Sequence, residues 1–381
     1  MQYISKSVSE NLIMRNATFA SRGMQLFLTP YFFGQLFSAA KSFEANPLIG
    51  SARLNALGLH KTRVAVAYRR AQARRAKLSK FISAEDRKAF ERDGFVVRRN
   101  FLPKTVFEQL VAEIKEHRCR SEERLWGETI NRKILVDTAV TSKIPTLKKV
   151  LNSPDWRNLI AYVGGCSSTP LVYIQTLYRQ GGAIDPQTRL HSDTFHSTTK
   201  AWLFLTDVHE NEGAFTYVPG SHKLTPEKLD WQHRMSLRAA KSTDRETREG
   251  SFRIDASELD GLGLPQPVQL AVPANTLVVA DTSGFHARGP SKAGTLRVEI
   301  WALGRRQPFL SWGGVEPWTS ETLGSMLTVL QGMRDSVNLK SRHWSYRSGM
   351  SAFDAGDQAG PQQISTEGGN IREDRWTTRV A

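Results

Sequence analysis

The sequence from His191 to Val218 reads HSDTFHSTTKAWLFLTDVHENEGAFTYV, and it combines two apolar runs with a closely spaced pair of ligand-type residues. The runs 200–208 and 214–218 are rich in aromatic and β-branched residues and are separated by a turn-forming Asn and Gly, which predicts two strands. On an extended strand, residues i and i+2 point to the same face, so His191 and Asp193 would present an imidazole and a carboxylate to a common point. A His-x-Asp pair alone is a weak signal, because it often arises by chance.

Short runs of the same kind lie on both sides of this stretch. They are separated by turn residues, and this pattern is typical of an antiparallel sandwich or barrel. A short segment precedes them, in which Ser83 is the expected N-cap of a helix and Asp93-Gly94 forms a turn into the strand Phe95-Val96-Val97. The strands that the pattern predicts are Leu171–Tyr178, Lys200–Val208, Ala214–Val218, Val268–Val272, Thr276–Val279 and Leu296–Leu303.

A third ligand-type residue, His286, follows the buried-looking run Thr276 to Ala280. A later strand of the same barrel can bring its imidazole to the point that His191 and Asp193 share. Two His and one carboxylate on one side of a metal form the facial triad of non-haem Fe(II) oxygenases, which leaves three coordination positions open. The three residues together therefore favour an iron site, although zinc or manganese in a cupin remains an alternative at this point.

Arg297 lies eleven residues after His286, within the apolar run 296–303. An arginine in an apolar strand needs a partner, and its planar guanidinium fits a carboxylate. The partner could be a bound ligand, or it could be Glu299, which shares the strand face of Arg297 at i+2. Together with the three ligand-type residues, the pattern favours a bound ligand.

In these residues the sequence resembles the phytanoyl-CoA dioxygenase family of Fe(II)/2-oxoglutarate-dependent oxygenases. The resemblance covers about residues 83–305. Its motifs are Phe90-Glu-Arg-Asp93-Gly94-Phe95-Val96-Val97, His191-x-Asp193, Ala201-Trp202, Asn211-Glu212-Gly213, Val218-Pro219-Gly220-Ser221-His222-Lys223, and His286 with Arg297.

The resemblance implies a mainly β fold with flanking helices, the double-stranded β-helix or cupin-like jelly-roll barrel. It also implies Fe(II) as the metal and 2-oxoglutarate and O₂ as cosubstrates. Carried over by position, it makes His191, Asp193 and His286 the iron ligands and Arg297 the clamp on the distal carboxylate of 2-oxoglutarate. Trp202 and, more loosely, Gln175 match positions in the cosubstrate pocket. A basic residue before the ligand strands binds cosubstrate in some members, and Lys133 could serve.

The reaction that the resemblance implies is hydroxylation of an unactivated C–H bond in a small or lipid-like substrate, with release of succinate and CO₂. Some relatives are halogenases in which a small residue replaces the carboxylate ligand, whereas Asp193 is present here. A different class of function is the alternative: a catalytically silent jelly-roll that binds a membrane or nucleic acid through its basic N-terminal extension.

The charge of the chain is concentrated at its N-terminal end. The 381 residues have a formal net charge of +15, and residues 1–80 hold 13 Lys and Arg but only Glu10 and Glu44 as acids. The sequence therefore predicts three parts: a basic, partly amphipathic extension over 1–80, an oxygenase domain over 81–310, and a helical piece with a loosely ordered tail over 311–381. The oxygenase domain contains a charge-rich insert at 223–266, which we interpret as a solvated surface loop.

The partners and location follow from the same charge distribution. We expect a small-molecule or lipid-like substrate and peripheral contact of the basic extension with an anionic membrane surface, and we consider nucleic acid an improbable partner. The apolar stretch Met24 to Ala40 is broken by Pro30 and Gly34 and falls short of the roughly 20 residues that a spanning helix needs. A cytoplasmic location is expected, with organellar import still open because the leader is rich in arginine.

Overall fold

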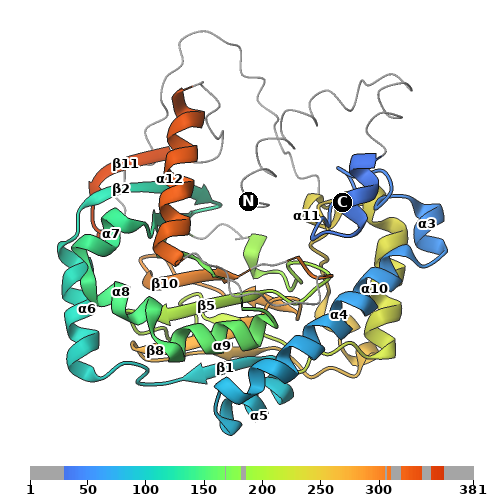
Figure 1. Ribbon diagram of the computed structural model, residues 1–381, viewed down its shortest axis with the longest axis horizontal. Coiled ribbons are helices and arrows are strands. Elements are labelled where there is room, and N and C mark those ends of the chain that lie inside the picture. Colours follow the sequence, from blue (N-terminus) through green and yellow to red (C-terminus); the bar gives the residue numbers. More distant parts are fainter. Residues whose placement is uncertain are drawn as a thin grey trace.

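The computed structural model describes residues 30–167, 169–181, 186–304, 307–309, 319–336 and 345–355, and it shows two antiparallel sheets flanked by helices (Figure 1). The larger sheet has eight strands in the order β1-β8-β5-β10-β4-β3-β2-β11, and the smaller has three in the order β7-β6-β9. The strand pairs that the structure describes are antiparallel. The mainly β, jelly-roll class with flanking helices that the sequence predicts is confirmed.

The predicted strands are all present in the structure. They are β4 (Leu171–Arg179), β5 (Thr199–Phe204), β6 (Phe215–Tyr217), β7 (Val268–Leu270), β8 (Thr276–Asp281) and β10 (Leu296–Gly304). Four further strands were not predicted: β2 (Cys119–Trp126), β3 (Thr129–Leu135), β9 (His286–Arg288) and β11 (Ser345–Met350).

The segment before the strands also folds as its sequence predicts. Helix α5 (Ala84–Asp93) begins at Ser83, whose side chain accepts a hydrogen bond from the Asp86 N–H, and it ends at Gly94 with φ 89°. Such a left-handed conformation suits glycine at a helix C-terminus. A Cβ at Gly94 would also lie 2.5 Å from Nδ1 of His222, so the turn into β1 (Phe95–Arg98) has no room for a side chain.

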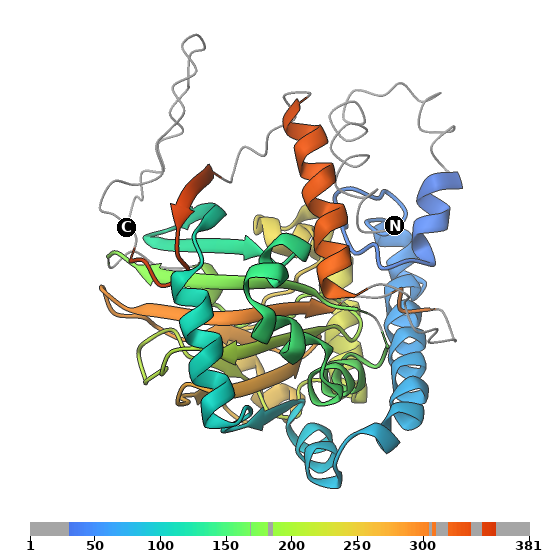
Figure 2. The ribbon, with the colours of Figure 1, turned by 60° about the vertical axis from the view of Figure 1, so that its left-hand side comes forward.

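One face of the larger sheet packs against helices. These are α6 (Lys104–Glu116), α7 (Thr138–Lys143), α8 (Pro145–Asn152) and α9 (Pro154–Gly164), and Figure 2 shows them as a layer beside the strands. On β10, Val298 and Ile300 belong to the apolar core beneath these helices. Because side chains alternate along a strand, Arg297 and Glu299 lie on the opposite, inner face.

The inner face of the larger sheet packs against the smaller sheet. Trp202 and Phe204 on β5 form one apolar cluster with Phe215 and Tyr217 on β6. The rings of Trp202 and Phe215 lie with their centroids 4.4 Å apart. This apolar cluster therefore fixes how the two sheets face each other. The polar residues of the inner face lie next to the cluster.

The basic helix of the N-terminal segment packs on the rest of the protein. Helix α4 (Leu59–Leu78) lies beside α10 (Pro226–Arg238) and α9, with α3 (Ala52–Ala56) before it (Figure 1). Three of its arginines are buried: Arg63, Arg74 and Arg75. Their guanidinium groups donate to backbone carbonyl groups, for example Arg63 to Leu36 and Ala40. The division of the chain at residue 80 stays a prediction, but these cations are not on a charged surface.

The insert at 223–266 is not a solvated loop, so that interpretation is wrong. It contains α10 and α11 (Arg245–Arg248), and Trp231 and Met235 of α10 lie in an apolar cluster with Phe43 and Ile49 of the N-terminal segment. The sequence of α10 shows why, because Trp231 and Met235 are four residues apart and lie on one face of the helix.

The C-terminal helix is confirmed as α12 (Ser320–Ser336). The loosely ordered tail predicted after this helix contains strand β11 in its described part, so the tail prediction is wrong there. The chain after residue 355, the first 29 residues and part of the apolar stretch 24–40 lie outside the described residues. Among the helices that the structure describes, none has both the length and the apolar character needed to cross a bilayer.

Candidate metal centre

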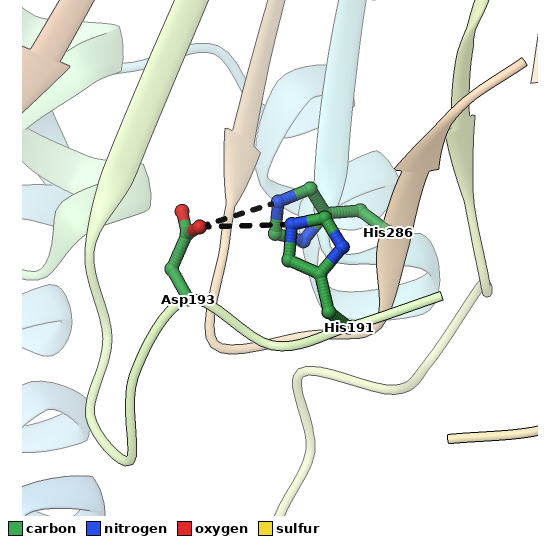
Figure 3. Close-up of side chains that lie close together, drawn as sticks. All are labelled: His191, Asp193 and His286. Carbon is green, nitrogen blue, oxygen red and sulfur yellow. Dashed lines mark ion pairs between the residues drawn. The ribbon is translucent and has the colours of Figure 1, made fainter. Parts of the chain in front are cut away.

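The three predicted ligand residues meet at one point (Figure 3). One ligand-type atom from each of His191, Asp193 and His286 lies within 4.8 Å of the others. The Nε2 atoms of His191 and His286 lie 3.9 and 3.7 Å from Oδ1 of Asp193. The three residues are between 4% and 9% exposed, so the group is shielded from bulk water.

Backbone pairing brings the three side chains together. His191 and His286 exchange both backbone hydrogen bonds at 2.9 Å, which places His191 beside the first residue of β9. The N–H of Asp193 donates to the carbonyl of Thr282 at 2.9 Å. Directly opposed residues of an antiparallel pair point to the same face, so both imidazoles face one side of the smaller sheet.

The hydrogen bonds of the imidazoles leave one nitrogen of each ring for a metal. Nδ1 of His191 lies 2.8 Å from the carbonyl oxygen of Arg189, and Nδ1 of His286 lies 3.0 Å from that of Gly284. A carbonyl only accepts, so each Nδ1 bears the proton and each Nε2 bears a lone pair. Burial lowers the pKa of His286 to about 4 and that of His191 well below its usual value. Both rings are therefore neutral near pH 7, as metal ligation requires.

These residues fit a divalent iron ion. Nε2 of His286 is buried and makes no hydrogen bond to the described residues, which is costly unless a ligand occupies that position. Two imidazole nitrogens and one carboxylate oxygen are the donor set of a non-haem Fe(II) site with open positions. The cupin sites that use additional His ligands differ from this set.

Two lysines contact Asp193, and sequence reasoning identified neither of them. Nζ of Lys200 lies 2.7 Å from Oδ2 of Asp193, and Nζ of Lys41 donates to its backbone carbonyl at 2.6 Å. Lys200 is the residue before the Ala201-Trp202 motif, so strand alternation could have placed it on the inner face beside Trp202. Lys41 comes from the N-terminal segment, and only the tertiary fold reveals its contact.

Arg297 is held by Glu299 on the inner face of β10. Its Nε lies 2.9 Å from Oε2 of Glu299, and its Nη1 donates to the backbone carbonyl of Gly213. Glu299 is fully buried, and this burial raises the pKa of its carboxyl although the nearby Arg297 charge opposes that rise. The pairing with Glu299 that the sequence left open as an alternative is therefore present. The assignment of Arg297 as the cosubstrate clamp stays a prediction.

The other cosubstrate candidates lie on the same inner face. Gln175 on β4 is opposite Lys133 on β3 and donates to the side chain of Asn131 at 2.7 Å. The Lys133 ammonium lies 4.2 Å from the ring centre of Trp301, and burial lowers its pKa to about 7. Trp202 lies in the apolar cluster between the sheets. The structure thus gathers the predicted residues on one face, and their roles toward 2-oxoglutarate stay predictions.

Two histidines close to the triad in sequence, His196 and His209, lie outside it. His209 is exposed in a loop. His196 is buried three residues after Asp193, and its Nδ1 lies 3.0 Å from the carbonyl of Ser197. The Pro219-Gly220-Ser221-His222 motif forms a turn in which Ser221 accepts a hydrogen bond from the N–H of Phe285 at 2.8 Å. The motif therefore forms a structural turn that supports the segment before His286.

Two facing antiparallel sheets, flanking helices and a buried His-Asp-His group agree with an oxidoreductase of the iron- and 2-oxoglutarate-dependent class. Residues 90–256 match the phytanoyl-CoA dioxygenase family, and this match confirms the resemblance over that segment. The matched segment includes His191 and Asp193. His286 and Arg297 lie beyond it and are brought to the site by β9 and β10.

Several solved structures are similar to this chain. The epimerase SnoN, in complex with Fe³⁺, alpha ketoglutarate and nogalamycin RO, is 18% identical, with a TM-score of 0.40 over 64% of this chain and 93% of that one. The carbocyclase SnoK from nogalamycin biosynthesis is 20% identical, with a TM-score of 0.36 over 58% and 83%. HygX from Streptomyces hygroscopicus, with nickel and 2-oxoglutarate bound, is 15% identical, with a TM-score of 0.38 over 58% and 87%. No curated protein matches the chain.

Proposed function

We propose that this enzyme hydroxylates an unactivated C–H bond of a small or lipid-like substrate and releases succinate and CO₂. The observation that supports the proposal is the intact group of His191, Asp193 and His286, in which the carboxylate that halogenases lack is present. Fe(II) held by this group would supply the oxidation chemistry with 2-oxoglutarate and O₂. The protein residues supply binding, orientation and exclusion of water.

The electrostatics of the site favour anionic cosubstrates. Lys200 pairs with Asp193, and Lys133 and Arg297 lie on the inner face that continues from the triad. 2-Oxoglutarate has two carboxylates, so one can be bound at the metal and the other can be received by a cation on this face. We infer that Arg297 is this cation and that Gln175 and Trp202 line the same space.

The N-terminal segment shields the site from water. Lys41 contacts the backbone of Asp193, and the neighbouring Phe43 belongs to the apolar cluster shared with Phe252 and Phe285. Exclusion of water protects a reactive oxidation step from side reactions. This packing supports a catalytic role for the chain over the alternative of a catalytically silent binding module.

The test is a substrate screen in which succinate release and product mass are measured together. The full-length enzyme with Fe(II), ascorbate and 2-oxoglutarate is expected to form succinate in equimolar amount with a product that has gained one oxygen atom. The Asp193→Ala variant is the control and should form neither. A product of unchanged mass, or one that has lost two hydrogens, would show an isomerising or ring-forming reaction and would contradict hydroxylation.

A cytoplasmic location with peripheral membrane contact is a further part of this proposal. The exposed basic residues of α4 support it, because cations near an anionic leaflet are each worth about 1 kcal/mol of binding free energy.

A further inference from the structure

A short segment of the insert lies alongside the first metal ligand. The N–H of Ser192 donates to Phe252 at 3.0 Å, and the N–H of Ile254 donates to Leu190 at 3.1 Å, which places Arg253 directly opposite His191. This is the antiparallel pair type in which the two opposed residues are not hydrogen-bonded to each other, and in which their side chains are closest. Arg253, His191 and His286 therefore lie in one row on the same face.

Two of the three guanidinium nitrogens of Arg253 are buried and make no hydrogen bond within the described residues. These are Nε and Nη1, and the residue is 8% exposed. The carboxylates of Glu246, Asp244 and Asp193 act on Arg253 only from a distance. Asp193 pairs with Lys200, and Asp244 accepts from the N–H and hydroxyl of Thr247. In the part of the chain that the structure describes, no carboxylate lies within ion-pair distance of Arg253.

A buried cation without a counter-charge is destabilising, and it persists where a ligand supplies the missing anion. We propose that Arg253 binds a carboxylate of the organic substrate beside the iron site. The inference rests on the proposed function and names the class of its substrate: an organic acid whose oxidised carbon lies within a few bonds of its carboxylate. The planar guanidinium offers two parallel N–H donors, which match the two oxygens of such a group.

The position of Arg253 separates it from the cosubstrate residues. Arg297 lies on β10 in the larger sheet, whereas Arg253 is next to His191 on the side away from His286 and β6. 2-Oxoglutarate has one carboxylate left after it binds a metal, and Arg297 suffices for it. Two neighbouring arginines of the insert have protein partners, since Arg245 pairs with Glu249 and Arg248 with Glu44. Arg253, by contrast, lies opposite a metal-ligand residue and has unpartnered buried nitrogens.

The first arm of the test measures whether the carboxylate at Arg253 belongs to 2-oxoglutarate. Cosubstrate is titrated anaerobically into the Fe(II)-loaded full chain by absorbance, for the wild type, Arg253→Met and Arg253→Lys, with Arg245→Met as the matched control. The Kd of 2-oxoglutarate is expected to stay within about twofold of the wild type in all variants. An increase of about tenfold or more in Arg253→Met would assign the anion to the cosubstrate and overturn the proposal.

The second arm uses acetate as a minimal carboxylate and acetamide as its uncharged counterpart. With Fe(II) and saturating 2-oxoglutarate at constant ionic strength, acetate should raise the thermal unfolding midpoint of the wild type by about 1 °C or more, and acetamide should not. The shift should persist in Arg245→Met, remain in part in Arg253→Lys, and vanish in Arg253→Met. No acetate-specific shift in the wild type, or an equal shift in Arg253→Met, would refute the site.

The two arms also separate this inference from the proposed function. Arg253→Met retains side-chain volume and removes an unpaired charge, so its midpoint without acetate should not fall below that of the wild type. Failure of the wild type to bind 2-oxoglutarate would refute the proposed function. Normal cosubstrate binding without an acetate effect would refute only the substrate site.

Discussion

At the scale of single residues, the site depends on ionisable groups that burial forces to find partners. Arg297 and Glu299 illustrate this, because both are buried on the inner face and their side chains pair at 2.9 Å. A carboxylate of 2-oxoglutarate arriving at Arg297 would compete with Glu299 for the guanidinium. Substitutions of Arg297 and of Glu299 can therefore distinguish a cosubstrate clamp from a purely structural ion pair.

We predict different effects for the two members of this pair. Arg297→Met should raise the apparent KM for 2-oxoglutarate by about tenfold or more, because it removes a charge-assisted bond of about 1.5–3 kcal/mol. Glu299→Gln removes the competing carboxylate and should not raise that KM. Steady-state kinetics with varied 2-oxoglutarate measure both. Equal increases in the two variants would indicate that Arg297 acts only through Glu299.

His60 predicts a pH dependence of stability. It lies fully buried on α4, its Nε2 is 2.9 Å from Oε1 of Gln232, and burial lowers its pKa to about 4. The charge of Arg63 contributes to this lowering of the pKa, and the hydrogen bond with Gln232 opposes it. Below about pH 6.5 the unfolded chain binds a proton that folded His60 does not, so stability falls as pH falls toward about 4.

The size of this pH effect on stability follows from the lowered pKa of His60. Between about pH 7 and about pH 5 the metal-free wild type should lose about 1–2 kcal/mol more unfolding free energy than a His60→Gln variant. Urea unfolding at the two pH values measures the difference. Identical losses in the two proteins would show that His60 does not remain neutral in the folded state.

At the scale of elements, helix α4 is tied to the strand that leads to the metal centre. Nη2 of Arg75 lies 2.6 Å from Oδ2 of Asp281 at the end of β8, with the two side chains 4% and 0% exposed. Burial alone would raise the pKa of Asp281, but the Arg75 charge and hydrogen bonds from Ser283 lower it overall. Thr282, the next residue, accepts the hydrogen bond from Asp193.

Removing one partner of this pair should be costly. Arg75→Met leaves Asp281 buried without its counter-charge and should lower the unfolding free energy by about 3–5 kcal/mol. Arg70→Met, at an exposed position of the same helix, should change it by no more than about 0.5 kcal/mol. Urea unfolding of both variants decides the point, and similar small effects would mean that α4 contributes little to the folded body.

The elements that the sequence predicts are those with a regular hydrophobic pattern. Strands β4, β8 and β10 either alternate apolar and polar residues or are apolar throughout. The N-cap Ser83 and the turn at Gly94 can be recognised from local sequence signals. The hairpin of β2 and β3 was missed because its inner face is polar and its buried charges pair only after folding, as Arg132 does with Glu123 at 2.6 Å.

The candidate site, like the fold, could be predicted only where a local sequence pattern encodes it. The His-Asp-His group follows from residue type and strand alternation. Lys41, Lys200 and Arg253 reach the site through contacts between distant segments, which no local pattern encodes. The buried arginines of α4 were mistaken for surface charge for the same reason, because their acceptors, such as the Gly165 carbonyl, are far away in sequence.

At the scale of the whole molecule, part of the positive charge behind the net charge of +15 is buried, so fewer cations face solvent than composition suggests. Of the basic residues of α4, Arg63, Arg74 and Arg75 are buried and Lys61 is partly exposed. Arg69, Arg70 and Lys77 are exposed. Contact with an anionic membrane surface therefore depends on few residues of this helix, and deleting the segment would also remove the Arg75 to Asp281 pair.

A charge-reversal variant tests membrane contact without disturbing the packing. Arg69→Glu combined with Arg70→Glu should reduce co-sedimentation with phosphatidylserine-containing vesicles, because each lost contact costs about 1 kcal/mol of binding free energy. Binding to purely phosphatidylcholine vesicles is the control, and 2-oxoglutarate turnover should not change. Unchanged binding to the anionic vesicles would remove α4 from the membrane proposal.

We infer that His191, Asp193 and His286 hold an iron ion to which 2-oxoglutarate binds. The most direct measurement is an anaerobic absorbance titration of Fe(II) and 2-oxoglutarate into the full-length protein, with His191→Ala as the comparison. We expect a saturable metal-to-cosubstrate charge-transfer band in the wild type and its loss in the variant. The absence of a band in the wild type, or an equal band in His191→Ala, would contradict it.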